Sequence, residues 1–406
     1  MASVIVVDSE FKDSVLEYGQ IIDGINKSYD FSESLKTFFN NDDISNKKEL
    51  SKKIAESSSA SNLTKLSDKE FEPTYNLIIY LLTQLEEPFT SYEQIFHKDS
   101  VIIKNLIEST PTEKPSIRDR KAIKYTTILS IFNTIFNFLP ETSSTRIFII
   151  ECILNVVEKS NVEFTFIQDS IGKNLDNWLK NANASESEIK SIFWKFITLD
   201  KLHSLKSLQL IKEFTSKYAP DLNELYELIQ FALKSETADV SFLINNNVSK
   251  AIAANKNDEL VSFFQSYVKG DIIKTVPSAL NQSSEDILIK SKILSLARFF
   301  IENDNNNKNV FKYTDIPSDL VTSNQDFEEL LITSIKSGLI EGKLNQLDES
   351  FHLTKVKRFI IAGDEENLVK NWEYVRQALV DWRIALDNLD EIVNTSREEI
   401  VSNNSN

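Results

Sequence analysis

The chain carries very few residues that break a helix. Its 406 residues include only 7 glycines and 8 prolines, so tight turns must be scarce. Apolar residues recur instead at spacings of three and four, as in the series Phe11, Val15, Tyr18, Ile22 and Ile25, which mark one face of an α-helix. Both features favour a predominantly helical protein over a sandwich or a barrel.

The amino-acid composition further limits what class of protein this chain can be. The apolar content of 41% allows sizeable cores, and the length suggests about two or three domains. The net charge of −16 is spread along the chain and works against non-specific binding of nucleic acid. The single cysteine, Cys152, lies in an apolar run, which predicts a small buried residue in a protein of a reducing compartment.

No targeting or membrane segment is expected. Met1–Val7 lacks the cationic start and long apolar core of a secretory signal. No apolar run reaches the roughly 18 residues that a membrane-spanning helix needs. These observations predict a cytoplasmic protein.

The middle of the chain, 71–282, reads as stacked helices. We expect helices at about 145–159, 162–180, 186–200, 204–218, 221–233, 239–254 and 257–269. Short connections make successive helices antiparallel neighbours, and pairs recurring every ~35–40 residues are typical of helical-repeat solenoids of the HEAT or TPR kind. Ser185 with Glu188 and Asp221 with Glu224 have the spacing of capping boxes. The preceding part, 1–70, is interpreted as N-terminal helices and a flexible linker around Ser57–Ser61.

The segment 283–363 reads as a compact module that caps the solenoid. The predicted order is a helix at Ile287–Glu302, an Asn-rich loop at 303–309, a short helix near Asp315–Val321, a helix at Gln325–Ser337, and strands at Leu339–Gln346 and Ser350–Lys355. Helix, helix, helix and hairpin is the order of a winged-helix module. Gly338 is expected in the left-handed conformation that ends a helix.

The terminal helix, 364–400, carries an apolar stripe. Its residues are spaced by three and four over three heptads: Trp372, Val375, Leu379, Trp382, Leu386, Leu389 and Val393. Aromatic residues on such a stripe are typical of interfaces. The alternative is that the stripe packs on the chain's own wing. The two interpretations are equally supported around Trp372, whereas from Leu386 onward we expect a partner helix.

Binding of nucleic acid has weak support in the sequence. Winged helices often read DNA with their second helix, but here that helix carries Asp326, Glu328 and Glu329 against Lys336. The candidate contact for RNA or for an acidic partner is the basic cluster Lys355, Lys357 and Arg358. Its alternative interpretation is a solvated turn.

No pattern indicates a reaction centre. His97, His203 and His352 are far apart in the sequence and lack the spacing of zinc ligands. No phosphate-binding loop and no nucleophile elbow is present in the sequence. We therefore expect no catalytic, cofactor or metal site.

A helical solenoid capped by a winged helix resembles the PCI family, whose members are scaffold subunits of the proteasome lid, the signalosome and translation initiation factor 3. The resemblance is strongest over 292–390, through KILSLA at Lys292–Ala297, LIEGKLNQ at Leu339–Gln346, and the pair Trp372 and Trp382. The initiation-factor members are the most similar. The Asn-rich insertion at 303–309 departs from the family pattern.

The resemblance implies a non-catalytic scaffold subunit that supports assembly of the 43S pre-initiation complex on the 40S ribosomal subunit and recruitment of mRNA. Its partners would be other PCI and MPN subunits, joined through a shared bundle of terminal helices and through the edge of the wing at Leu344, Phe351 and Leu353. Direct contact with RNA stays open. The alternatives are a PCI subunit of the proteasome lid or the signalosome, and a free winged-helix adaptor that binds nucleic acid.

Overall fold

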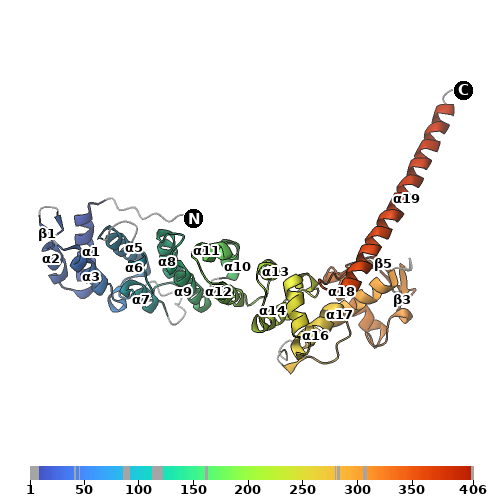
Figure 1. Ribbon diagram of the computed structural model, residues 1–406, viewed down its shortest axis with the longest axis horizontal. Helices are drawn as coiled ribbons and strands as arrows, with labels where there is room; N and C mark the ends of the chain where they lie inside the picture. The colour runs from blue at the N-terminus through green and yellow to red at the C-terminus, as the bar shows by residue number, and fades with distance from the viewer. Residues whose placement is uncertain are drawn as a thin grey trace. The chain divides into compact units, whose positions relative to one another are not determined.

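The computed structural model describes residues 9–40, 43–44, 46–85, 92–111, 122–160, 163–278, 280, 284–304 and 309–403. These residues are mainly α-helical, with one two-stranded and one three-stranded antiparallel sheet (Figure 1). The chain divides into two compact units, Met1–Asp200 and Lys201–Asn406. A run of helices followed by a C-terminal module with a small sheet is compatible with the predicted architecture. The finer boundaries near 70, 282 and 363 stay predictions.

The first unit is a succession of helices with one short two-stranded ribbon. Its elements are α1 (Phe11–Asn26), α2 (Asp30–Lys36), β1 (Phe39–Asn40), β2 (Asp43–Ile44), α3 (Lys47–Ser57), α4 (Ala60–Leu63), α5 (Asp68–Leu85), α6 (Tyr92–Ile95), α7 (Val101–Glu108), α8 (Tyr125–Phe138), α9 (Thr145–Lys159), α10 (Phe164–Ile167), the π-helical turn η1 (Gln168–Gly172), α11 (Leu175–Asn181) and α12 (Glu186–Thr198). The predicted stripe of α1 is its core face, since Val15, Tyr18 and Ile22 are buried.

The segment interpreted as a linker is packed into the first unit. Ser57 ends α3 and Ala60 begins α4, so only a short break separates the two helices. Ser58 is fully buried, and its carbonyl accepts a hydrogen bond of 2.9 Å from the Asn105 side chain on α7. The serine-rich composition suggested mobility, but the small side chains let α7 approach this backbone closely.

The second unit holds the remaining helices and the sheet. Its elements are α13 (Leu205–Lys217), α14 (Leu222–Lys234), the 3-10 turn η2 (Ser241–Leu243), α15 (Asn246–Ala254), α16 (Glu259–Lys269), α17 (Ser284–Asp304), β3 (Val310–Lys312), the 3-10 turn η4 (Tyr313–Asp315), α18 (Asn324–Lys336), β4 (Ile340–Asn345), β5 (Ser350–Val356) and α19 (Glu365–Asn403).

The predicted helix starts are mostly confirmed. Both capping boxes form, at Ser185 and at Asp221. Two predicted helices are wrong in extent. The helix expected at 162–180 is interrupted by the π-helical turn, and the one expected at 239–254 becomes η2 followed by α15. Asn245 causes the second break, because its side chain accepts hydrogen bonds from the first amides of α15.

The C-terminal module differs from the predicted order between its two long helices. The short helix expected near Asp315–Val321 is absent there, and β3 and η4 precede that stretch. Ile316 is extended, with φ −78° and ψ 133°, because the following Pro317 disfavours helical backbone at the residue before it. The Asn-rich loop expected at 303–309 lies largely outside the described residues.

An aromatic core joins the sheet to α17. The strand order is β3–β5–β4, and Phe311 on β3 and Phe351 on β5 both lie against Phe300, with ring centres 4.9 and 5.5 Å away. All three rings are fully buried. Gly338 has the predicted left-handed conformation, with φ 71°, at the turn between α18 and β4.

Candidate partner-binding surface on the terminal helix

The terminal helix begins at a defined cap. The Asp364 side chain accepts a hydrogen bond of 3.1 Å from the Asn367 amide, and Glu365 and Glu366 place negative charge in the first turn, where the helix dipole favours it. From there α19 runs for 39 residues. Figure 1 shows it leaving the module, with no other labelled element of its unit beside its distal half.

The predicted stripe of α19 is exposed along its whole length. The exposed fractions are 65% for Trp372, 42% for Val375, 57% for Leu379, 63% for Trp382, 48% for Leu386, 57% for Leu389 and 58% for Val393. We call these seven residues the α19 seam. The described part of the chain does not cover it, which argues against the interpretation in which the Trp372 half packs on the chain's own wing. An uncovered apolar surface of this extent is typical of interaction sites.

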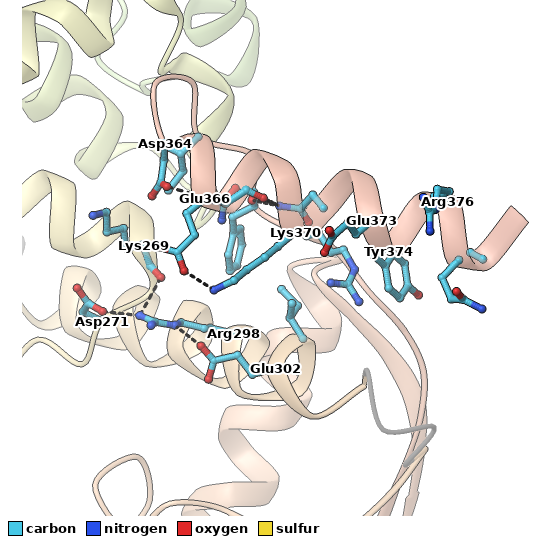
Figure 2. A pocket seen from close by; sticks show the side chains of 18 of the residues that line it. Lys269, Asp271, Arg298, Glu302, Asp364, Glu366, Lys370, Glu373, Tyr374 and Arg376 are labelled. Atoms are coloured by element: carbon cyan, nitrogen blue, oxygen red, sulfur yellow. Dashed lines mark hydrogen bonds and ion pairs between the residues drawn. The ribbon is translucent and has the colours of Figure 1, made fainter. Parts of the chain in front are cut away.

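A different face of α19 contacts the module. Lys370, Tyr374 and Asp381 line a groove of about 1040 Å³ whose opposite wall includes Lys269 and Arg298. Figure 2 shows these walls and the ion pairs within them. Because a residue turns by about 100° in an α-helix, the centre of this polar face lies roughly 130° around the helix from the α19 seam. The base of α19 is therefore attached through its polar side, and the apolar side faces away.

Ion pairs and ring stacking line this groove. Arg298 pairs with Glu302 at 2.9 Å and also with Asp271, and Lys370 pairs with Glu366 at 2.7 Å. These pairs are largely exposed, so each contributes little to stability. Stacking adds a firmer contact, since the Arg358 guanidinium carbon lies 3.4 Å from the centre of the Tyr374 ring.

The three predicted wing-edge residues do not share an edge. Phe351 and Leu353 lie on β5, which is the middle strand of the sheet, and both are buried. Their assignment to an edge is wrong, because β3 pairs with β5 on the side that the predicted hairpin left open. Leu344 lies on β4, an outer strand, and is half-buried.

The basic cluster is divided among different contacts. Lys355 pairs with Glu341 across the β4–β5 hairpin at 3.1 Å, Arg358 stacks on Tyr374, and Lys357 is exposed. Two of the three cations therefore have partners within the module. This leaves little concentrated charge for a phosphate backbone.

The acidic face of α18 is used within the module. Glu328 accepts hydrogen bonds from the Tyr313 hydroxyl at 2.9 Å and from the Gln346 amide at 2.7 Å. Burial, followed by the hydrogen bond to Glu328, raises the pKa of Tyr313 to about 12. This helix presents no basic surface to a nucleic acid.

No other cluster among the described residues indicates chemistry. In those ranges no group of three or more histidine, cysteine or acidic side chains could hold a metal ion. No described helix combines the length and the apolar character needed to cross a bilayer. The Cys152 thiol is buried, which raises its pKa to about 12, so it is a poor nucleophile.

Two features of α19 were not predicted from the sequence. The contact between Arg358 and Tyr374 joins residues from different elements and has no local signal. Arg376 and Arg383, by contrast, stand three or four residues from members of the α19 seam, a spacing that places them on its border. The heptad pattern could have identified them.

Comparison with known proteins extends the resemblance to almost the whole chain. The relatives are proteins named eukaryotic translation initiation factor 3 subunit M. The Aspergillus fumigatus protein is 23% identical, covering 98% of this chain and 87% of the relative. The Aspergillus terreus protein is 24% identical, covering 99% of this chain and 89% of the relative. The Emericella nidulans protein is also 24% identical, covering 98% of this chain and 91% of the relative. No family model matches the chain. The resemblance to the initiation-factor branch is confirmed, and it is not restricted to the C-terminal module.

Proposed function

We propose that this chain is a non-catalytic scaffold subunit of eukaryotic translation initiation factor 3. The similarity to proteins named as subunit M, over 98% of the chain, supports membership in that complex. The exposed α19 seam supports the scaffold role and is the single observation that carries it. Fully burying a large apolar side chain contributes roughly 1.5–3 kcal/mol, so covering seven of them by a partner helix would be strongly favourable.

The module provides a second surface for assembly. The order α17, β3, α18, β4, β5 supports a winged helix, with the β4–β5 hairpin as its wing. The outer strand β4 offers backbone groups and Leu344 to a neighbouring wing. In this proposal other PCI and MPN subunits contact β4 and α19, and the chain reaches the 40S subunit and mRNA in the cytoplasm through the whole complex.

The alternatives differ in what they require. A subunit of the proteasome lid or the signalosome would use the same two surfaces with other partners. An independent nucleic-acid adaptor would need a basic second helix, and α18 carries Asp326, Glu328 and Glu329. That acidic helix opposes the adaptor function.

Co-purification tests the proposal. The tagged chain, expressed at its natural level, should recover initiation-factor subunits and small-subunit ribosomal proteins, identified by mass spectrometry. Trp382→Glu combined with Leu386→Glu should lose most of these partners. Recovery of lid, signalosome or cullin-linked proteins instead would reject the assignment to the initiation factor.

A matched control lies on the same helix. Val380 and Ile384 are 44% and 52% exposed and have the same spacing of four residues, but they lie outside the α19 seam. Val380→Glu combined with Ile384→Glu adds the same charge to α19 and should retain the partners. If both double variants retain the full set of partners, the α19 seam is not the contact.

A further inference from the structure

We propose that the α19 seam receives an amphipathic helix of a different protein that carries carboxylates along the border facing Arg376, Arg383 and Arg397. We call these three residues the arginine row. The inference rests on the proposed function, because it specifies the chemistry of the partner that covers the α19 seam.

The arginine row follows one border of the α19 seam. Arg376 comes four residues after Trp372 and three before Leu379, and Arg383 comes four after Leu379 and three before Leu386. Residues at these spacings are neighbours on a helix surface. Arg397 continues the border four residues beyond Val393. Any helix seated on the α19 seam therefore passes close to these guanidinium groups.

Two members of the arginine row, Arg376 and Arg383, are weakly neutralised by the described side chains of α19. Arg383 faces Asp387 at 3.9 Å, with the two side chains 84% and 73% exposed, so water screens that pair. Arg376 is one of the residues that line the groove between α19 and the module, but it forms no ion pair with the side chains that the structure describes. These cations are free to pair with carboxylates of a partner, for which the guanidinium fork is well suited.

The opposite border of the α19 seam has no comparable charge. It is formed by uncharged residues at the equivalent heptad positions: Asn371, Ala378, Ala385 and Ile392. The two alanines lack bulk, so a partner helix can approach closely on that side. The asymmetry between the borders sets how a partner lies, with its acidic side on the arginine row and its uncharged side over the alanines.

A second copy of this chain does not supply the complement. In a parallel pair of α19 helices, the arginine row would face the uncharged border of the other copy. In an antiparallel pair, the two arginine rows would face each other, relieved only by Asp390 on the same border. In a parallel pair of α19 helices the arginines would therefore lack acidic partners, and in an antiparallel pair they would repel each other. The helix that carries the carboxylates therefore comes from a different protein. The residue of that helix that faces Asp390 should not be acidic, because two carboxylates would repel each other.

Two synthetic, helix-stabilised peptides test the inference. They share one apolar stripe that matches the α19 seam and differ only on one border, which carries glutamates in one peptide and lysines in the other. Binding of the labelled peptides to the full-length chain is followed by fluorescence anisotropy. At about 0.1 M salt we expect the glutamate peptide to bind at least roughly tenfold more tightly, and this advantage should shrink as salt rises.

Variants of the arginine row complete the test. Arg376→Glu combined with Arg383→Glu should reverse the preference, and Arg376→Lys combined with Arg383→Lys should keep it. Both positions are exposed, and circular dichroism checks that the fold is unchanged. Equal affinities for the two peptides, a preference for the lysine peptide, or binding of neither would each overturn the inference.

This result is independent of the test of the proposed function. A chain that loses its cellular partners with the Trp382→Glu and Leu386→Glu changes but shows no glutamate preference would keep the scaffold role and reject the acidic partner. A clear glutamate preference, with lid or signalosome proteins recovered in cells, would keep the acidic partner and reject the assignment to the initiation factor.

Discussion

The guanidinium carbon of Arg358 lies 3.4 Å from the centre of the Tyr374 ring, and this contact ties the segment after β5 to the base of α19. Asn371 adds a long hydrogen bond of 3.5 Å to the Phe359 carbonyl. The two contacts hold the start of α19 against its module through Tyr374 on the polar face and Asn371 on one border of the α19 seam. The direction of the helix is therefore set without use of the apolar side chains of the α19 seam.

Removing the ring should loosen the base of α19. Tyr374→Ala deletes the stacking partner of Arg358, and a cation–π contact contributes about 0.5–1 kcal/mol at exposed sites. Hydrogen exchange of the amides at 365–377 should become faster, while exchange in the first unit stays the same. Tyr374→Phe keeps the ring and serves as the control. Unchanged exchange in the alanine variant would show that the stacking does not anchor the helix.

Gly342 should tolerate no side chain. A Cβ atom at this position would overlap the Phe351 ring and the His352 carbonyl oxygen, next to the bulge between Glu341 and Gly342. Overpacking of this kind costs about 1–3 kcal/mol, so Gly342→Ala should lower the unfolding midpoint of the second unit.

Gly24 on α1 provides the contrast for that substitution. No atom lies within 4 Å of a Cβ built there, and alanine favours a helix over glycine by up to about 1 kcal/mol. Gly24→Ala should therefore leave stability unchanged or raise it. Equal effects of the two substitutions, measured by thermal unfolding, would contradict this account of Gly342.

Asp68 should make the first unit sensitive to acid. Its carboxylate accepts hydrogen bonds from the Thr127 hydroxyl at 2.7 Å and from the Lys124 amide at 2.9 Å, and it pairs with the Lys124 ammonium at 3.3 Å. Partial burial favours the protonated form, but these hydrogen bonds and the lysine charge outweigh it and lower the pKa of Asp68.

A lowered pKa in the folded state stabilises the fold above the ordinary aspartate value of about 4, and this contribution is lost as pH falls through the folded-state value. Asp68→Asn should therefore cost about 1–2 kcal/mol at pH 7 and progressively less in acid. Urea unfolding at neutral and acidic pH measures the difference. The exposed Asp13 on α1, changed to asparagine, is the control; a cost for Asp68→Asn that is independent of pH would contradict the charge-based explanation.

The Cys152 thiol should react very slowly with alkylating reagents in the folded chain. With a pKa of about 12 caused by burial, only roughly one thiol in ten thousand is ionised at pH 8. Alkylation by iodoacetamide should be at least about 100-fold slower than in urea, where the thiol is exposed and has its usual pKa. Rapid labelling of the folded chain would show that α9 opens easily.

Local patterns predicted much of the fold. The capping boxes at Ser185 and Asp221, the left-handed Gly338 and the stripe of α19 depend on spacings within one element, which the sequence displays directly. The π-helical turn at Gln168–Gly172 was missed, because packing between elements decides whether a helix of marginal propensity continues. The break before α15 was also missed, although the Asn245 cap that causes it is a local signal.

Contacts between elements could not be read from the chain in the same way. The short strand β3 has little pattern of its own, and its pairing with β5 moves Phe351 from an expected edge to the centre of the sheet. Pro317 is a sequence signal against the helix expected around it, because proline disfavours helical backbone at the residue before it. No sequence signal brings Arg358 to Tyr374. The seven residues of the α19 seam, however, could be predicted from their heptad spacing. The sequence left open whether the chain itself covers the Trp372 half.

The central claim is that the α19 seam is uncovered in the isolated chain and covered by a partner in the complex. Acrylamide quenching of Trp372 and Trp382 tests it directly, with the double variant Trp372→Phe and Trp382→Phe used to subtract the signal of the other indoles. We expect both indoles to be strongly quenched in the purified monomer and shielded in the assembly isolated from cells. Indoles that are already shielded in the monomer, or that stay equally accessible in the assembly, would contradict the account.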